Sequence, residues 1–193
     1  MNLEIIFALI TSYFIGSIPF GFLITKFFLR EDIRKVGSGN IGATNVLRTG
    51  KKFLAALTLV FDVSKGYITI FVASKYFPDY VYLSGLICFL AHIFPVWLKF
   101  KGGKGVATYL GIILAFSFNL ALVFGISGLI ILFLSKYSSL SSIIGSFNTF
   151  LFSFLSDVIV ADFLFFAFFM IIIFTHRQNI IRLKDKTESK IKF

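Results

Sequence analysis

Long apolar runs fill most of this chain of 193 residues, and they approach or exceed the roughly 20 residues with which a helix crosses a bilayer. Hydrophobic residues make up 58% of the chain and charged residues only 15%, so a soluble fold would leave large apolar patches exposed. In lipid the backbone must form helices or a closed barrel, and the runs lack the two-residue alternation of barrel strands. We therefore expect an all-α, polytopic integral membrane protein.

The apolar runs predict about seven transmembrane helices, near residues 3–28, 53–75, 80–98, 105–117, 119–135, 138–155 and 158–175. Pro19 should kink the first helix. The fourth to sixth segments are crowded together, so a five-span arrangement with re-entrant segments is an open alternative. No linker divides the chain, and we expect one domain over residues 1–193.

Basic residues lie mainly in the first, third and fifth connections and in the C-terminal tail, and the net charge is +10. By the positive-inside rule, the N-terminus is expected outside and the C-terminus in the cytoplasm. The basic loops are short and lie against the membrane, and they contain no nucleic-acid-binding module. We therefore expect membrane lipid and small anions as partners, and no nucleic acid.

The first polar connection contains the sequence GSGNIGATN over residues 37–45, followed by Arg48. Glycines allow backbone N–H groups to converge on an oxygen-rich ligand, and hydroxyl and amide side chains add further hydrogen bonds. A phosphate site is one interpretation. The alternative is a turn-rich connector with a helix N-cap at Thr44 or Asn45.

A second polar stretch, KFKGGKG at residues 99–105, directly precedes a predicted helix. Free N–H groups at that helix N-terminus, together with Lys101 and Lys104, would suit the same kind of anion. Lysines that only fix the topology are the alternative, although they would not explain three glycines. The stretch is not a Walker A loop, because it lacks the required spacing and the magnesium-binding hydroxyl.

The third polar stretch follows the last apolar run. On a helix, His176, Asn179 and Arg182 would share one sector and point at one pocket. A solvated helix end is the alternative. Within the second apolar run, Asp62 and Lys65 indicate a buried ion pair with a structural role, or else the wall of a site.

Three ordered motifs resemble those of the bacterial acyl-phosphate:glycerol-3-phosphate acyltransferases, the PlsY family. They are residues 37–45 with Arg48, residues 101–108, and residues 176–183 with Glu188. The similarity continues through GSIPFG, DVSKG, HIFPVWLKFKGGKG and SLSSI, so it covers nearly the whole chain. Ala91 and Lys186 depart from the family pattern, since each replaces a usual glycine. The second departure puts the turn geometry of the tail in question.

The resemblance implies an enzyme that transfers an acyl group from acyl phosphate to the 1-hydroxyl of sn-glycerol 3-phosphate. The products would be lysophosphatidic acid and inorganic phosphate, in the first step of phospholipid biosynthesis. It also implies a place in the bacterial cytoplasmic membrane, a cytoplasmic active site, a soluble partner enzyme that makes acyl phosphate, and neither metal nor cofactor.

The resemblance also assigns residues. The expected catalytic residues are Ser38, Arg48, His176 and Asn179. The expected substrate- and phosphate-binding residues are Gly37, Gly39, Asn40, Gly42, Thr44, Asn45, Lys101, Gly102, Gly103, Lys104, Gly105, Thr108, Ser142 and Arg182. The expected structural residues are Asp62, Lys65 and Glu188. The general base is either His176 or a substrate phosphate.

Two other functions compete with this interpretation. A transporter of phosphorylated metabolites would use the basic stretches as a vestibule, but such proteins tend to show repeated halves and broken helices at the midplane. A membrane scaffold that recruits anionic lipid by charge alone is the second alternative. It would not bind sn-glycerol 3-phosphate stereospecifically.

Overall fold

The computed structural model describes residues 3–155 and 159–191, and within these ranges it contains helices and turns but no β-strand. The predicted all-α class is therefore confirmed for the described residues. The chain divides into two compact units, Met1–Ala115 and Phe116–Phe193. A single domain over the whole chain stays a prediction.

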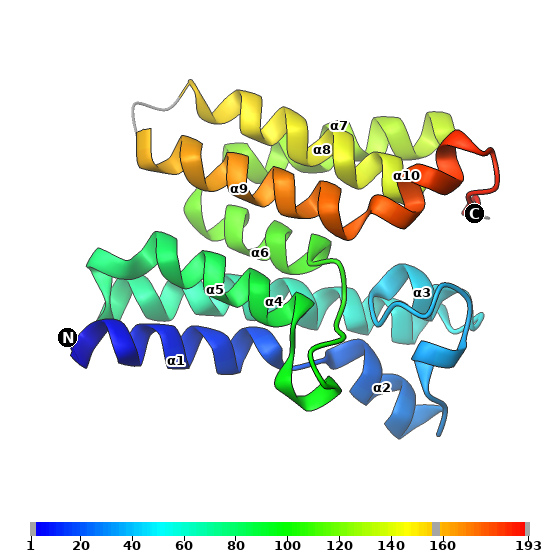
Figure 1. The fold of residues 1–193 in the computed structure, drawn as a ribbon, viewed down its shortest axis with the longest axis horizontal. Helices are drawn as coiled ribbons and strands as arrows, with labels where there is room; N and C mark the ends of the chain where they lie inside the picture. The colour runs from blue at the N-terminus through cyan, green and yellow to red at the C-terminus, as the bar shows by residue number, and fades with distance from the viewer. Residues whose placement is uncertain (1–2, 156–158, 192–193) are drawn as a thin grey trace. The chain divides into compact units, whose positions relative to one another are not determined.

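Helices α1, α4 and α5 pack against one another in the first unit (Figure 1). Small residues allow this close packing, because a Cβ at Gly16 would meet the backbone of Cys88 on α5. The elements of this unit are α1 (Leu3–Ser17), α2 (Phe20–Phe28), η1 (Ile33–Lys35), α3 (Ala43–Leu47), α4 (Lys52–Tyr76), η2 (Pro78–Tyr80), α5 (Val81–Ile93), η3 (Val96–Leu98) and α6 (Val106–Phe116).

The first apolar run is broken where the sequence predicts a kink. Helix α1 ends at Ser17, and α2 begins at Phe20, directly after Pro19. Proline has no N–H to donate into the preceding turn, so the regular ladder of hydrogen bonds stops there. The break leaves the Ile18 carbonyl outside both helices, and that carbonyl accepts a hydrogen bond from the α4 residue Lys65.

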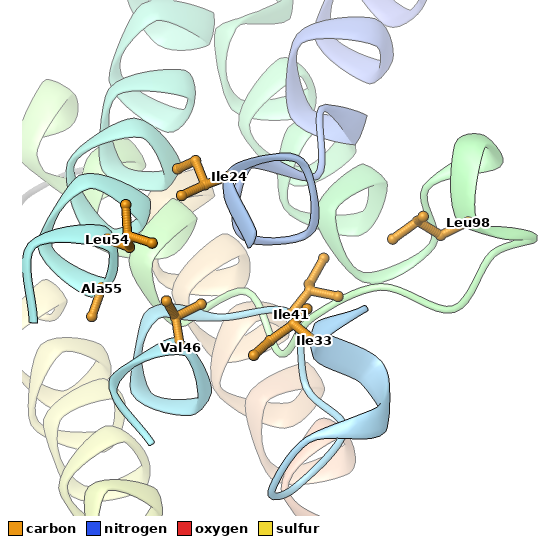
Figure 2. Packing of buried hydrophobic residues seen from close by; sticks show 7 residues of the cluster. All are labelled: Ile24, Ile33, Ile41, Val46, Leu54, Ala55 and Leu98. Atoms are coloured by element: carbon orange, nitrogen blue, oxygen red, sulfur yellow. The ribbon is translucent and has the colours of Figure 1, made fainter. Parts of the chain in front are cut away.

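The first polar connection is held by a cluster of apolar side chains. Ile33, Ile41 and Val46 lie between its polar residues and are almost fully buried. Figure 2 shows them facing residues of α2 and α4; the cluster comprises Ile24, Ile33, Ile41, Val46, Leu54, Ala55 and Leu98. Burial of these side chains fixes the loop on the helices, while Ser38, Thr44 and Arg48 stay at the surface.

The second unit contains α7 (Phe118–Ser135), α8 (Ser138–Ser153), α9 (Ile159–Thr175) and α10 (Arg177–Lys184). Helix α8 packs against both α7 and α9. A bend of 60° separates the segment Ala161–Thr175 from α10. The third polar stretch begins at this bend, which is visible where α9 meets α10 in Figure 1.

Several helices are long and apolar enough to cross a membrane. By length and composition these are Leu3–Phe28, Lys52–Tyr76, Pro78–Leu98 and Phe118–Ser135, and the bent pair of α9 and α10 makes a fifth if it counts as one span. Helix α6 is apolar but shorter. The multi-pass character is thus supported, while seven spans and their orientation stay predictions.

Candidate functional site

Asn45 organises the first polar loop from within. Its side chain is 2% exposed, and its Nδ2 lies within hydrogen-bonding distance of three carbonyl oxygens. The acceptors are Ile33 at 3.1 Å, Val36 at 2.9 Å and Asn40 at 2.8 Å. Its Oδ1 accepts the N–H of Ser38 at 2.9 Å. The amide therefore serves as a cross-link between the two ends of the loop.

The backbone of this loop differs from the sequence-based expectation. The idea that its N–H groups converge on a ligand is wrong for Ser38, Gly39 and Gly42, because these groups donate within the loop. The Gly42 N–H donates to Asn40 Oδ1 at 3.3 Å, and the Gly39 N–H to the Val36 carbonyl at 3.0 Å. The alternative of an N-cap at Thr44 or Asn45 is also wrong, since α3 begins at Ala43 after Gly42.

Several polar side chains of the loop reach its surface. Ser38, Thr44 and Arg48 are exposed. Gly37 adopts φ +55°, and a Cβ there would lie 2.9 Å from Cδ of Arg48. The predicted catalytic residues Ser38 and Arg48 are therefore brought close together, because the Arg48 side chain lies against the residue that precedes Ser38. The positive φ, together with Asn45 Oδ1 at 2.5 Å from the Cβ position, explains why residue 37 is glycine.

A neighbouring carboxylate neutralises one of the loop's cations. Asp32 and Arg34 form an ion pair at 2.6 Å, and Asp32 also accepts the backbone N–H of Arg34. Hydrogen bonds from the Arg34 side chain lower the pKa of Asp32 to about 2, although slight burial acts in the opposite direction. Arg34 therefore adds little positive charge for an anionic ligand.

The glycine loop, residues 99–105, connects η3 to α6 and folds back onto the end of α5. The N–H of Gly102 donates to the Ile93 carbonyl at 2.9 Å, and that of Gly103 donates to the His92 carbonyl at 3.1 Å. The expectation that these two glycines present free N–H groups to an anion is therefore wrong. They cap the C-terminus of α5 instead.

Glycine is required at these positions because neighbouring atoms lie very close to the backbone of the loop. A Cβ at Gly102 would meet the His92 carbonyl, and one at Gly103 would meet the imidazole of His92. Gly105 adopts φ +85° beside the Phe89 ring and accepts the N–H of Tyr109 as α6 begins. The first N–H groups of α6 have no partner within the helix, so they remain suitable for an anion.

The polar side chains of the second motif differ in exposure. Lys101 is exposed and Lys104 is partly buried. Thr108 is fully buried, and its Oγ1 has no hydrogen-bond partner among the described residues. The structure thus places the two lysines, but not the Thr108 hydroxyl, where a soluble anion can reach them.

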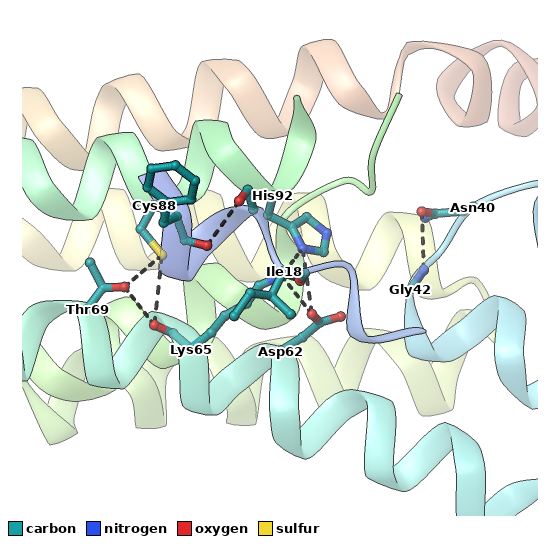
Figure 3. A network of polar contacts seen from close by, with 10 residues as sticks. Ile18, Asn40, Gly42, Asp62, Lys65, Thr69, Cys88 and His92 are labelled. Atoms are coloured by element: carbon teal, nitrogen blue, oxygen red, sulfur yellow. Dashed lines mark hydrogen bonds and ion pairs between the residues drawn. The ribbon is translucent and has the colours of Figure 1, made fainter. Parts of the chain in front are cut away.

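Asp62 and Lys65 form the buried ion pair that the sequence indicates, at 2.9 Å. The third member of this group was not predicted: it is His92 on α5, whose Nδ1 lies 2.8 Å from Lys65 Nζ (Figure 3). No periodicity links α4 to α5, so only the packing of these helices reveals the contact. None of the three side chains is more than 4% exposed.

Glu188 is the centre of the polar cluster in the second unit. Its carboxylate accepts hydrogen bonds from Asn179 Nδ2 at 2.6 Å, Ser139 Oγ at 2.8 Å and Arg182 Nε at 2.7 Å. Burial raises the pKa of Glu188, but these hydrogen bonds outweigh that effect, and the net pKa lies below its ordinary value. The predicted structural residue therefore holds two residues of the third motif.

The other predicted residues of this unit are placed differently. The helix does not continue through His176, which stands between α9 and α10 and is 2% exposed. Its Nδ1 lies 2.8 Å from the Ile172 carbonyl. Ser142 donates to the Ser138 carbonyl of its own helix. Ser139, which was not predicted as a site residue, is the serine of α8 that reaches Glu188.

The tail turn accommodates its unusual residue. Lys186 adopts φ +57°, the left-handed conformation that glycine adopts most easily. The N–H groups of Thr187 and Glu188 both donate to the Arg182 carbonyl and close the turn. The absence of glycine here therefore does not prevent the turn that presents Glu188.

A potential metal site is not evident in the described ranges, where no three His, Cys, Asp or Glu side chains lie close enough to share an ion. The polar clusters instead offer hydroxyls, amides and cations, which suit phosphate-bearing ligands.

Comparison with known proteins identifies one family. A family model described as glycerol-3-phosphate acyltransferase matches residues 6–186. A glycerol-3-phosphate acyltransferase of Pelagibacter ubique is 48% identical over 190 residues, which cover 98% of this chain and 99% of the relative. Its counterpart from Brucella anthropi is 47% identical over 191 residues, with coverages of 99% and 95%.

Two solved structures share the fold. One is the integral membrane glycerol 3-phosphate acyltransferase PlsY in its glycerol 3-phosphate form, with a TM-score of 0.93 and 38% identity. The other is its lysophosphatidic acid form, with a TM-score of 0.90 and 37% identity. Each comparison covers 99% of this chain and 96% of the solved one.

Proposed function

The chain belongs to the family of glycerol-3-phosphate acyltransferases, and from this we propose that it uses acyl phosphate to acylate the 1-hydroxyl of sn-glycerol 3-phosphate. The products are 1-acyl-glycerol 3-phosphate, which is lysophosphatidic acid, and inorganic phosphate. The observation that carries the proposal is the family match over residues 6–186, which includes the three polar motifs apart from Glu188. The two ligand forms of the related PlsY agree with this acceptor and this product.

The chemistry needs no strong protein nucleophile. The acceptor hydroxyl oxygen forms a bond to the acyl carbon, and the bond from that carbon to the phosphate oxygen breaks. The hydroxyl proton passes to a base, and inorganic phosphate leaves with the electron pair. Acyl phosphate is an activated mixed anhydride, so alignment and neutralisation of two phosphates supply most of the catalysis.

In the first unit, we assign the phosphate contacts to exposed side chains. Ser38 and Arg48 hydrogen-bond phosphoryl oxygens of one substrate, and the proximity of Arg48 to Gly37 supports their joint action. Lys104, with Lys101 nearby, binds the phosphate of glycerol 3-phosphate, together with the first N–H groups of α6. Asn45 then acts by holding the loop rather than by contact with substrate.

In the second unit, we assign the acceptor hydroxyl to His176 and Asn179. A carbonyl oxygen only accepts hydrogen bonds, so the contact with Ile172 places the His176 proton on Nδ1. Nε2 of the neutral ring then carries a lone pair, as a general base requires. Asn179 is oriented by Glu188. A phosphate oxygen of a substrate is the competing base.

We also propose that the enzyme lies in a bacterial cytoplasmic membrane with its active site toward the cytoplasm. The concentration of Lys and Arg in the connections that carry the motifs supports this orientation. A water-soluble acceptor then meets a membrane-bound donor at the inner interface, and a soluble partner enzyme provides the acyl phosphate.

The proposal is tested with the purified, detergent-solubilised protein. Acyl phosphate and sn-glycerol 3-phosphate are supplied together, and phosphate release and lysophosphatidic acid are measured. We expect both products in equal amounts, and both to form more slowly with the Ser38→Ala variant. The absence of product from a folded wild-type sample would refute the function.

A further inference from the structure

The side chain of Lys65 is fully engaged inside the first unit. Its ammonium forms an ion pair with Asp62 Oδ1 at 2.9 Å and lies within hydrogen-bonding distance of His92 Nδ1 and of the Ile18 carbonyl, each at 2.8 Å. Figure 3 shows these groups converging between α4, α5 and the break after α1. Burial of an ion pair in a membrane helix costs free energy, and apolar residues packed in its place often stabilise a protein equally well. Stability alone does not account for this arrangement.

The acceptors are located where the chain changes direction. Ile18 lies in the break between α1 and α2, and His92 is the penultimate residue of α5. Tyr13 and Trp97 add hydrogen bonds in the same region. The Tyr13 hydroxyl donates to the Phe94 carbonyl at 2.9 Å, and Trp97 Nε1 donates to Ser17 Oγ at 3.0 Å. The end of α1 is thus connected to the segment between α5 and the glycine loop.

His92 transmits this arrangement to the glycine loop. An ammonium only donates hydrogen bonds, so His92 Nδ1 is the acceptor and the ring proton lies on Nε2. That opposite edge lies against Gly103, where a Cβ would meet Nε2 and approach Cε1 to 2.9 Å. The His92 carbonyl also accepts the Gly103 N–H. The ring and the backbone carbonyl of His92 therefore both position Gly103.

We propose that Asp62, Lys65 and His92 form a positioning assembly that sets the glycine loop for binding of the acceptor's phosphate. None of the three touches substrate. Asp62 fixes the ammonium, the ammonium fixes the imidazole, and the imidazole supports the loop that carries Lys101 and Lys104. This inference rests on the proposed function, which assigns those lysines to glycerol 3-phosphate.

The test compares two replacements of His92 in the full-length protein. Asparagine retains an oxygen acceptor near the position of Nδ1, whereas leucine has none. We expect His92→Leu to raise KM for glycerol 3-phosphate by roughly tenfold or more, because small displacements of a binding group have effects of this size. KM for acyl phosphate should change less than about twofold, and His92→Asn, which keeps an acceptor for Lys65 but not the ring against Gly103, should recover part of the loss.

Binding provides a second readout that requires no turnover. Glycerol 3-phosphate should raise the thermal unfolding temperature of wild type and His92→Asn, and should raise that of His92→Leu less at the same concentration. Equal KM values for glycerol 3-phosphate and equal thermal shifts in all three proteins would overturn the inference. So would a loss in kcat alone. A wild type that forms no product would refute the proposed function itself, so the two failures are distinguishable.

A paired substitution covers the case in which His92→Leu does not fold. Gly103→Ala places a methyl group against the imidazole, and the shorter side chain of His92→Asn vacates that space. We expect the double variant to have a lower KM for glycerol 3-phosphate than Gly103→Ala alone. If the fold increase in KM of the double variant equals the product of the increases in the two single variants, the positioning role is contradicted.

Discussion

The Nδ1 of His176 lies 2.8 Å from the carbonyl oxygen of Ile172, four residues earlier, so one turn of α9 fixes the tautomer of the ring. In the proposed reaction Nε2 accepts the hydroxyl proton. We expect His176→Ala to lower kcat by about 10²- to 10⁴-fold, the usual contribution of a general base, with a smaller effect on KM for either substrate. Steady-state phosphate release measures both. Wild-type kcat in the folded variant would assign the base to a substrate phosphate.

Substitutions of Lys104 and Ser38 should affect different kinetic constants, the first KM and the second kcat. Lys104→Ala removes a charge that binds the acceptor's phosphate, and we expect KM for glycerol 3-phosphate to rise by about tenfold or more, since hydrogen bonds to charged groups are worth about 1.5–3 kcal/mol. Ser38→Ala should mainly lower kcat. Lys101→Ala is the matched control, and its effect should be smaller because Lys101 is exposed. Identical kinetic changes in all three variants would contradict these roles.

Asn45 and Asn40 offer a matched pair for loop stability. In Asn45→Asp, a carboxylate replaces a donor that faces three carbonyl oxygens, and we expect the free energy of unfolding to fall by about 2 kcal/mol or more. In Asn40→Asp the recorded interaction with Gly42 uses Oδ1, which aspartate retains, so stability should change by less than about 0.5 kcal/mol. Thermal unfolding and protease cleavage of the loop measure the difference. Equal destabilisation would show that the Asn45 amide is not the cross-link.

Glu188 should make the second unit sensitive to acid. Its folded-state pKa is lowered relative to the unfolded state, so its contribution to stability is fully present above the ordinary glutamate pKa and disappears as pH falls through the folded-state value. Below about pH 4.5, the wild-type unfolding temperature should therefore decline more steeply than that of Glu188→Gln. At neutral pH, the variant should be the less stable protein. If the unfolding temperatures of the two proteins fall equally with pH, the acid sensitivity does not come from Glu188.

The sequence predicted the helices and the polar motifs well because both follow from local patterns. Apolar runs require helices in lipid, and the kink at Pro19 follows from its missing N–H. The buried pair of Asp62 and Lys65 was also predictable, since an isolated charge in a span is too costly. These inferences needed no knowledge of which helices are neighbours.

The use of the glycines was not predictable from the sequence. Gly102 and Gly103 follow a helix that ends at Ile93, and only the return of the chain shows that their N–H groups cap that helix. A glycine that binds an anion and one that avoids a carbonyl oxygen look alike in a sequence. The same limit concealed the contacts of Ser139 with Glu188 and of His92 with Lys65, because residues on different helices share no periodicity.

The environment of Lys65 has a chemical consequence for an enzyme that handles an acylating reagent. Acyl phosphates modify amines through the nitrogen lone pair, so a lysine must be both deprotonated and accessible to the reagent before it reacts. Lys65 is therefore protected from the proposed donor by its own hydrogen bonds and by burial at 2% exposure. Lys101, at the exposed surface of the glycine loop, has no such burial and is open to self-acylation.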